Sequence, residues 1–434
     1  MLQKLRFTTR EYELYNLYGF IKKNSVKFAA MKKILIIGGG AAGFFAAIQI
    51  AQNTTKPHQI TILEQSKKVL EKVKISGGGR CNVTHACFDP RELVSYYPRG
   101  NKALLGPFHQ FMCGDMMAWL ADQNVETKIE EDGRIFPITD NSQTIIDCFQ
   151  EAVQRLKIKV QTQTKALAFH QHNTHWLVET NQGTLKADKI IMATGSSRSI
   201  WEQLKQLGHH IETPAPSLFT FKIKDPLLKD LPGLSVKNGG VKVKDAKLQE
   251  TGPILITHWG LSGPGILKLS AWGARQLQER QYQFTIYVNW TNYEVREVQE
   301  TLRSLKQQSP KKKLISTPLF EIPKRLWSRM IERQNLTQKN FADLSKKDIE
   351  NLTNTVAHCA LQVSGKSTNK DEFVTCGGIR LNEVNFKTMQ SKIHPNLHFA
   401  GEILDIDALT GGFNFQAAWT TAWVAAKSIV EDLR

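Results

Sequence analysis

The sequence has few cysteines and no long hydrophobic run, and both shortages limit the class of protein. No apolar stretch approaches the roughly 18 residues of a membrane-spanning helix, so we expect no transmembrane segment. The six cysteines are scattered without a disulfide framework, which is typical of a reducing compartment. We therefore expect a cytoplasmic protein. The cysteines are Cys81, Cys87, Cys113, Cys148, Cys359 and Cys376.

Acidic residues are scarce beside basic ones, since 40 Asp and Glu face 57 Lys and Arg and leave a formal charge of +17. Residues 1–33 contribute +6, and a basic run lies at 311–313. Such a charge attracts nucleic acid, anionic lipid or anionic substrates. The alternative, which we favour, is a solvated basic surface, because no RNA-binding motif is recognisable. We therefore do not expect nucleic acid as a partner.

Histidines with the spacing of metal ligands are also missing. His170, His172 and His175 lie along an expected strand, and His209 and His210 are adjacent. We interpret both groups as surface residues and expect no metal site.

One stretch carries a specific signal. The apolar run 34–37 meets a glycine turn at 38–43, which an alanine-rich helical segment at 44–52 follows. A second strand-like run, 59–63, ends in Glu64, 21 positions after the last glycine of the turn. Strand, Gly-x-Gly-x-x-Gly turn, helix, strand and acidic end form the fingerprint of a dinucleotide-binding βαβ unit.

The glycines of this fingerprint have different tasks. Gly38 permits the tight turn, Gly40 leaves room for a pyrophosphate, and Gly43 allows the helix to pack closely on the strand. The helix N-terminus offers free N–H groups to the phosphates, and Glu64 is placed to accept hydrogen bonds from a ribose. A second fingerprint and a Cys-x₄-Cys pair are missing, which argues against a resident NAD(P)H domain and a thiol–disulfide reductase.

Further glycines follow in the positions where a long cofactor needs them. Gly77, Gly78 and Gly79 stand in a loop at 72–84, where consecutive N–H groups form a nest for an anion or for the polar edge of a flavin. A short apolar strand at 189–193 runs into Thr194-Gly195. Near the C-terminus, Gly401 ends another strand, and Gly411 and Gly412 open a final helix whose positive end suits an electron-rich group.

Between these α/β segments the chain changes character. Prolines and strand-like runs dominate 199–292, and charged amphipathic helices follow at 293–357. We predict four parts: an extension at 1–30, a discontinuous dinucleotide-binding domain at 31–198 and 373–434, a β-rich domain at 199–292 and 358–372, and a helical insert at 293–357. We also expect Met31 to be the natural start.

Taken together, these motifs resemble the BaiN/YhiN-like family of FAD-dependent flavoproteins. The resemblance rests on 38–43, 76–84, 193–195 and 257–264, and on 399–407 with 411–416, and it covers about 31–434. It implies FAD in a glutathione-reductase-like Rossmann domain of α/β class, interrupted by a β-barrel domain with a small helical insert. This chain departs from the family at Phe413, where tyrosine is common, and at Cys376, where a small residue is usual.

The resemblance implies an FAD-dependent oxidoreductase that transfers hydride to or from a small or steroid-like organic substrate. We favour reduction of a conjugated C=C bond, with NAD(P)H as a transient visitor. The alternatives are an amine oxidase, an RNA-binding flavoprotein and a non-catalytic FAD-binding protein. The expected cofactor-binding residues are Gly38, Gly40, Ala41, Ala42, Gly43, Glu64, Gln65, Lys74, Ser76, Gly77, Gly78, Gly79, Arg80, Cys81, Asn82, Thr194, Gly195, Gly401, Glu402, Asp405, Gly411, Gly412 and Asn414.

Two residues are candidates for a catalytic role. His258 sits before a Gly-Leu-Ser-Gly-Pro turn, and a neutral imidazole suits proton transfer near pH 7. Its alternative role is a structural hydrogen bond within the turn. Arg80 could steer an anionic substrate or polarise a carbonyl, and its alternative role is to hold phosphate.

Overall fold

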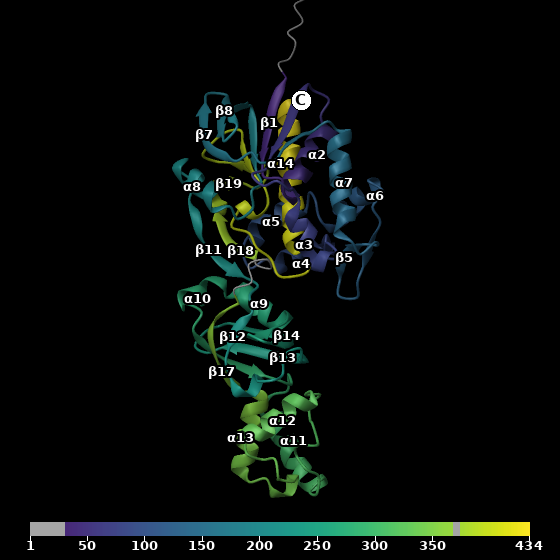
Figure 1. Ribbon diagram of the computed structural model, residues 1–434, viewed down its shortest axis with the longest axis vertical. Helices are drawn as coiled ribbons and strands as arrows, with labels where there is room; N and C mark the ends of the chain where they lie inside the picture. The colour runs from purple at the N-terminus through teal and green to yellow at the C-terminus, as the bar shows by residue number, and fades with distance from the viewer. Residues whose placement is uncertain (1–30, 368–373) are drawn as a thin grey trace, which may run out of the picture.

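The computed structural model describes residues 31–367 and 374–434, so the expectations for residues 1–30 lie outside the described residues. Figure 1 shows an α/β domain at one end, a β-barrel below it and a helical insert at the far end. We call residues 31–218 with 374–434 the α/β domain. The barrel and the insert together, residues 219–366, are called the arm.

A seven-stranded sheet forms the centre of the α/β domain. Its order is β19-β20-β21-β10-β1-β2-β6, and β1 pairs in parallel with both β2 and β10. The apolar run Ile34 to Ile37 is buried throughout, as expected for a strand covered on both faces. The strands are β1 (Lys32–Ile37), β2 (His58–Leu63), β6 (Lys159–Gln161), β10 (Lys189–Met192), β19 (Val384–Asn385), β20 (Gln390–Ser391) and β21 (Leu397–Phe399).

Two helices from opposite ends of the chain pack against each other beside this sheet. They are α2 (Ala41–Asn53) and α14 (Phe413–Leu433), and alanines on both are buried in the shared core. None of the helices in 31–367 and 374–434 has the length and hydropathy to cross a membrane. The remaining helices of this domain are α3 (Glu71–Gly79), α4 (Pro90–Leu93), α5 (Asn101–Phe108), α6 (Cys113–Asp122), α7 (Ser142–Arg155) and α8 (Arg198–Gln206).

Smaller sheets complete the α/β domain. The order β3-β5-β4 unites Thr84–His85, Arg134–Pro137 and Thr127–Ile129. The order β7-β8-β9 unites Ala166–His172, His175–Thr180 and Gly183–Ala187.

The arm leaves and rejoins the α/β domain through a two-stranded neck. Strand β11 (Ile211–Ser217) pairs antiparallel with β18 (Val374–Ile379), and Ser217 lies opposite Val374. The outgoing and returning chains therefore run side by side.

The arm begins with a closed antiparallel barrel of order β12-β15-β14-β13-β16-β17. Three helices are inserted between its last two strands, and Figure 1 places them at the end away from the α/β domain. The elements are β12 (Phe221–Ile223), β13 (Ser235–Val243), β14 (Gln249–Thr257), β15 (Gly260–Ser262), α9 (Pro264–Trp272), α10 (Ala274–Glu279), β16 (Phe284–Asn289), α11 (Val295–Gln308), α12 (Lys324–Arg333), α13 (Lys346–Ala357) and β17 (Cys359–Lys366). The expected α/β fold with an inserted barrel and helical insert is confirmed.

Barrel and insert share one hydrophobic core. Buried barrel residues such as Ile286 and Val288 belong to the same cluster as Trp327 and Met330 of α12. The α/β domain has its own cluster, which includes Trp201 of α8. The arm is therefore a single packed body, and α8 packs with the α/β domain.

Candidate functional site

The turn after β1 shows why its glycines are needed. Gly38 has φ +113°, and a Cβ there would lie 2.4 Å from the Ala193 carbonyl oxygen. A Cβ on Gly43 would lie 2.0 Å from the Gly38 oxygen, so only glycine lets α2 approach the strand this closely. A Cβ on Gly40 would meet nothing within 4 Å. Two glycines are therefore required by the fold, whereas Gly40 borders open space in front of the helix N-terminus.

Glu64 lies beside this turn at the end of β2. Its Oε2 accepts from the Gly39 N–H and its Oε1 from the Ser66 N–H, both at 2.8 Å. A carboxylate has further acceptor capacity beyond these two bonds. The neighbouring Gln65 is exposed. Glu64 is thus held in place by backbone groups and keeps lone pairs for a hydroxyl donor.

The triple-glycine segment has a non-helical backbone, as expected of a loop, but the residues before it, 71–75, form a helical turn. It closes α3, but Ser76, Gly77 and Gly78 leave the helical conformation, with φ of 57° and 69° at the two glycines. A Cβ on Gly78 or Gly79 would meet nothing within 4 Å. A ligand can therefore approach the backbone of Gly78 and Gly79 closely.

Two buried polar atoms near the site are unsatisfied. Asn82 Oδ1 and Thr194 Oγ1 have no hydrogen-bond partner within the described ranges. Buried polar groups are rarely left unpaired, so such atoms indicate a missing polar partner. With the open glycines and Glu64, they fit a cofactor that carries hydroxyl and phosphate groups.

The ends of the parallel strands bring further expected residues together. Lys72 donates to Glu402 Oε2 at 2.5 Å, and a Cβ on Gly195 would lie 3.5 Å from that oxygen. The Gly401 N–H donates to Thr421 of α14 at 2.9 Å. Segments more than 200 residues apart therefore meet at one edge of the sheet, where an α/β fold binds its ligand.

The start of α14 forms the other end of the site. Gly411 and Gly412 have φ of 131° and 93°, and a Cβ on Gly412 would lie 2.5 Å from the Thr84 oxygen. Asn414 is bonded to the backbone of Ala408, accepting at 2.9 Å and donating at 3.1 Å. The side chain of Asn414 thus fixes the loop, while the first N–H groups of α14 stay free for a ligand.

Sequence reasoning missed an aromatic group that supports this loop. His85 Nδ1 donates to the Gly411 oxygen at 3.0 Å, and its ring lies 4.4 Å from that of Phe413. Tyr96 stacks on Phe413 at 4.2 Å. Burial lowers the pKa of His85, so the imidazole is held neutral. The departure of Phe413 from tyrosine was noted in the sequence, but no local pattern marked His85.

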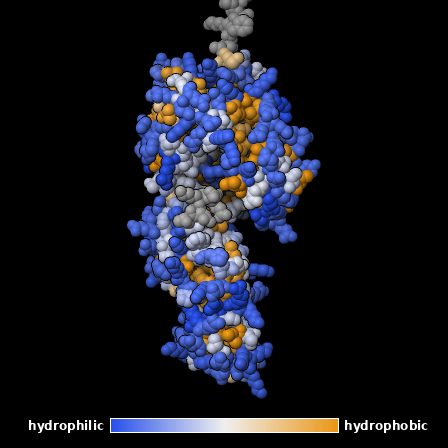
Figure 2. Space-filling view, in the orientation of Figure 1, coloured by the Kyte–Doolittle hydropathy of each residue, from blue (hydrophilic) through white to orange (hydrophobic). Residues whose placement is uncertain are grey.

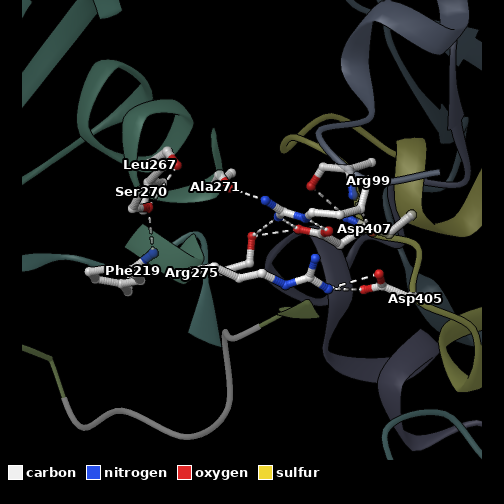
Figure 3. Close-up of polar contacts among 11 residues, drawn as sticks. Arg99, Phe219, Leu267, Ser270, Ala271, Arg275, Asp405 and Asp407 are labelled. Atoms are coloured by element: carbon white, nitrogen blue, oxygen red, sulfur yellow. Dashed lines mark hydrogen bonds and ion pairs between the residues drawn. The ribbon is translucent and has the colours of Figure 1, made fainter. Parts of the chain in front are cut away.

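An ion pair of the α/β domain contacts the arm immediately before this loop (Figure 3). Arg99 makes a two-pronged contact with Asp407, which also accepts from Ser217 Oγ at 2.7 Å. Arg99 donates a further bond to the Ala271 oxygen of α9 at 2.7 Å. Burial raises the pKa of Asp407, while Arg99 and Ser217 oppose that shift.

Asp405 lies beside this pair and contacts the arm. The Arg275 guanidinium of α10 donates to both of its oxygens, at 2.6 and 2.8 Å. We expected Asp405 to accept from the ribityl chain of a flavin, and that role stays a prediction. The observed contact instead ties the loop before Gly411 to the barrel.

The two catalytic candidates lie apart. Arg80 donates to Glu130 at 2.6 Å and stacks on Phe136 at 3.9 Å, so its charge is largely engaged by neighbours. His258 is exposed in the turn between β14 and β15. Both roles stay predictions.

Lys74 and Cys81 were expected to bind the cofactor, and His209 was expected to lie on the surface. Lys74 is exposed, and Cys81 is fully buried with the pKa of its thiol raised by burial to about 12. His209 is not a surface residue, which corrects our interpretation. It donates to Glu383 at 2.9 Å, accepts from Ser391 at 3.1 Å and is buried, while His210 is exposed.

Known proteins resemble the chain over nearly its whole length. The HI0933-like protein Rossmann domain matches residues 32–428. A ribosomal RNA dihydrouridine synthase of Escherichia coli is 26% identical over 409 residues, 91% of this chain and 97% of that protein. A 3-dehydro-bile acid delta(4,6)-reductase of Clostridium scindens is 26% identical over 414 residues, 92% and 100% of the two proteins.

A solved structure shares the fold. The 3-ketosteroid-delta4-(5alpha)-dehydrogenase of Rhodococcus jostii RHA1 superposes with a TM-score of 0.51 at 12% identity. The match covers 94% of this chain and 98% of that one.

Proposed function

Since residues 32–428 match it, the chain belongs to the HI0933-like Rossmann family of FAD-dependent oxidoreductases, and we propose that it reduces a C=C bond conjugated to a carbonyl. The observation that carries the proposal is the open cradle at Gly40, Gly78 and Gly79 beside Glu64. It suits one extended dinucleotide.

The names of two relatives describe one kind of bond change. A dihydrouridine synthase saturates the C=C bond of a uracil ring, and a delta(4,6)-reductase saturates C=C bonds of a 3-oxo steroid acid. In both substrates a carbonyl withdraws electrons from the double bond. A hydride acceptor of this kind is therefore the simplest substrate class for this chain.

In this reaction, bound FAD supplies a hydride that originates from NAD(P)H. The chain's residues would hold and orient the cofactor: the α2 N-terminus would bind the pyrophosphate, Glu64 the ribose, and the α14 N-terminus the pyrimidine edge. The reduced bond also needs a proton on the carbon next to the carbonyl. His258 is our candidate for supplying it.

A uridine in RNA is the second candidate substrate beside a steroid-like molecule, and the charge distribution favours it. The arm holds 24 Lys and Arg against 13 Asp and Glu, a net charge of +11. Residues 31–218 and 367–434 together hold 27 against 25. A basic surface concentrated on one body suits a polyanion better than a neutral steroid skeleton.

The proposal is tested by reducing the holoenzyme anaerobically with NADH or NADPH and adding candidate acceptors. We expect a conjugated 3-oxo steroid or an unmodified ribosomal RNA to restore the oxidised flavin spectrum, with the saturated product identified by mass. Reoxidation by oxygen or an imine alone, with neither alkene reduced, would contradict the proposal and favour an oxidase.

A further inference from the structure

We propose that the outer face of β13 and the pocket at its first residues form an RNA-binding surface on the arm. The proposal deepens the uridine candidate above and rests on it. It concerns how a long anionic substrate is held, away from the cofactor cradle.

Strand β13 and the residue directly after it carry a row of unpaired cations, which we call the β13 lysines: Lys237 and Lys242 in the strand, and Lys244 after its end. All three are exposed, and within the described residues none of their Nζ atoms has a hydrogen-bond or ion-pair partner. Seven residues separate the first from the last, so the row spans at most about 24 Å. Cations spaced along a strand in this way match the repeating charge of a nucleic-acid backbone.

The cross-strand neighbours of Lys242 are uncharged, whereas Glu321 lines the same pocket as Lys237 and Asp245 follows Lys244. Lys242 lies opposite Tyr287 of β16 and Gln249 of β14. The Tyr287 ring stacks on that of His358, which lies between α13 and β17, with centroids 4.0 Å apart. Unpaired cations interleaved with aromatic rings are the composition of a single-strand-binding face. Figure 2 also shows hydrophilic residues over much of the arm.

A pocket lies where β13 begins, at the junction of barrel and helical insert. Its volume is about 550 Å³, within the range of small-ligand sites. Tyr293 is 48% exposed there, and its ring lies 5.6 Å from that of Phe320. The lining includes Ser235, Lys237, Asn238, Tyr293, Phe320 and Glu321.

This junction pocket offers what an unstacked base requires. Tyr293 presents an aromatic face, and Ser235 and Asn238 supply groups that donate and accept hydrogen bonds. Lys237 belongs both to the pocket and to the β13 lysines, so one strand of RNA can place a base in the pocket while its phosphates follow β13. An anionic membrane would use the lysines but not the pocket.

The test uses the full-length holoprotein and an unmodified ribosomal RNA fragment, with binding followed by fluorescence anisotropy across a salt series. For K237Q/K242Q/K244Q we expect the slope of log affinity against log salt to become shallower by about 2. For Tyr293→Ala we expect about tenfold weaker binding at unchanged slope, because a stacked base is lost without a phosphate contact.

Matched variants on the α/β domain serve as controls. K157Q/K165Q/K186Q removes three exposed lysines there, and Phe88→Ala removes an aromatic residue that is 54% exposed. Both should bind RNA as the unaltered protein does. Equal losses in the control and arm variants, or no loss in either arm variant, would overturn the proposal.

Two further outcomes separate this inference from the proposed function. Salt-steep RNA binding that the arm variants weaken, without reduction of any alkene, would support the surface and refute the proposed reaction. Steroid turnover by a protein that binds no RNA would refute the surface and keep the reaction. If the arm variants lost binding to phosphatidylglycerol vesicles while their RNA affinity stayed unchanged, the face would be a lipid contact and the proposal would be overturned.

Discussion

At the scale of single residues, two glycines of one turn carry different constraints. We predict that Gly40→Leu keeps the fold but weakens FAD binding more than about tenfold, because its side chain enters only the open cradle. We predict that Gly43→Ala lowers the free energy of unfolding by about 3 kcal/mol, because its Cβ overlaps the Gly38 oxygen. Flavin absorbance and urea unfolding measure the two effects, and a folded Gly40→Leu protein with full FAD would refute the cradle.

A second residue-scale prediction concerns His398, which is fully buried on β21. Burial, with Lys189 nearby, lowers the pKa of His398 to about 3, against about 6.5 in an unfolded chain. The unfolded state therefore binds the proton first, and this contribution to stability is lost as pH falls below about 6.5. Between pH 6.5 and 5 the unaltered protein should lose about 2 kcal/mol more than His398→Leu.

Urea unfolding at both pH values measures that difference. His172→Gln, which alters an imidazole that is exposed on β7, is the control and should behave as the unaltered protein. Identical pH dependence in His398→Leu and the unaltered protein would contradict a buried neutral imidazole.

Some residues of the site were predictable from the sequence, and others were not. The glycines and Glu64 stand at fixed spacings within one βαβ unit, so local pattern suffices to find them. His85 supports Gly411 from 326 positions away, and His209 is buried only because Glu383 and Ser391 reach it from distant segments. Contacts of that kind depend on tertiary packing, which no local pattern encodes.

At the scale of elements, the loop before α14 is held by two ion pairs of different depth. Asp407 has a fully buried side chain, whereas Arg275, the partner of Asp405, is 39% exposed. Asp407→Asn leaves Arg99 nearly buried without a counter-charge and should cost about 3 kcal/mol of unfolding free energy. Arg275→Gln should cost about 1 kcal/mol, because position 275 is 39% exposed, so that water and the glutamine amide solvate the Asp405 carboxylate.

Urea unfolding of both variants at neutral pH tests this order. Equal costs for the two substitutions, or a larger cost for Arg275→Gln, would contradict the assignment of Asp407 as the buried anchor.

Elements themselves were mostly predictable, since periodicity marked the barrel strands and the helices at 295–308 and 324–333. The helical turn at 71–75 was missed, whereas Ser76, Gly77 and Gly78 have non-helical backbone angles, as the run of glycines predicts.

At the scale of the whole molecule, the boundary between the two hydrophobic cores is also the boundary between a basic and a nearly neutral body. The arm has one hydrophobic core and +11 of the formal charge of +17, whereas the α/β domain has its own core and is nearly neutral. Composition alone reported +17 without saying where it lies. The sequence suggested a solvated surface because the basic residues are scattered along it. Only the fold shows that many of them belong to the same packed body.

The paired neck has a consequence for modularity. Because Ser217 lies opposite Val374, the chain enters and leaves the arm at adjacent points, roughly 5 Å apart across one strand pair. The whole arm therefore connects β11 to β18 in the way that a short turn connects the two strands of a hairpin. A tight turn could replace it without stretching the rest of the chain, and a different substrate-holding module could be exchanged at the same two residues.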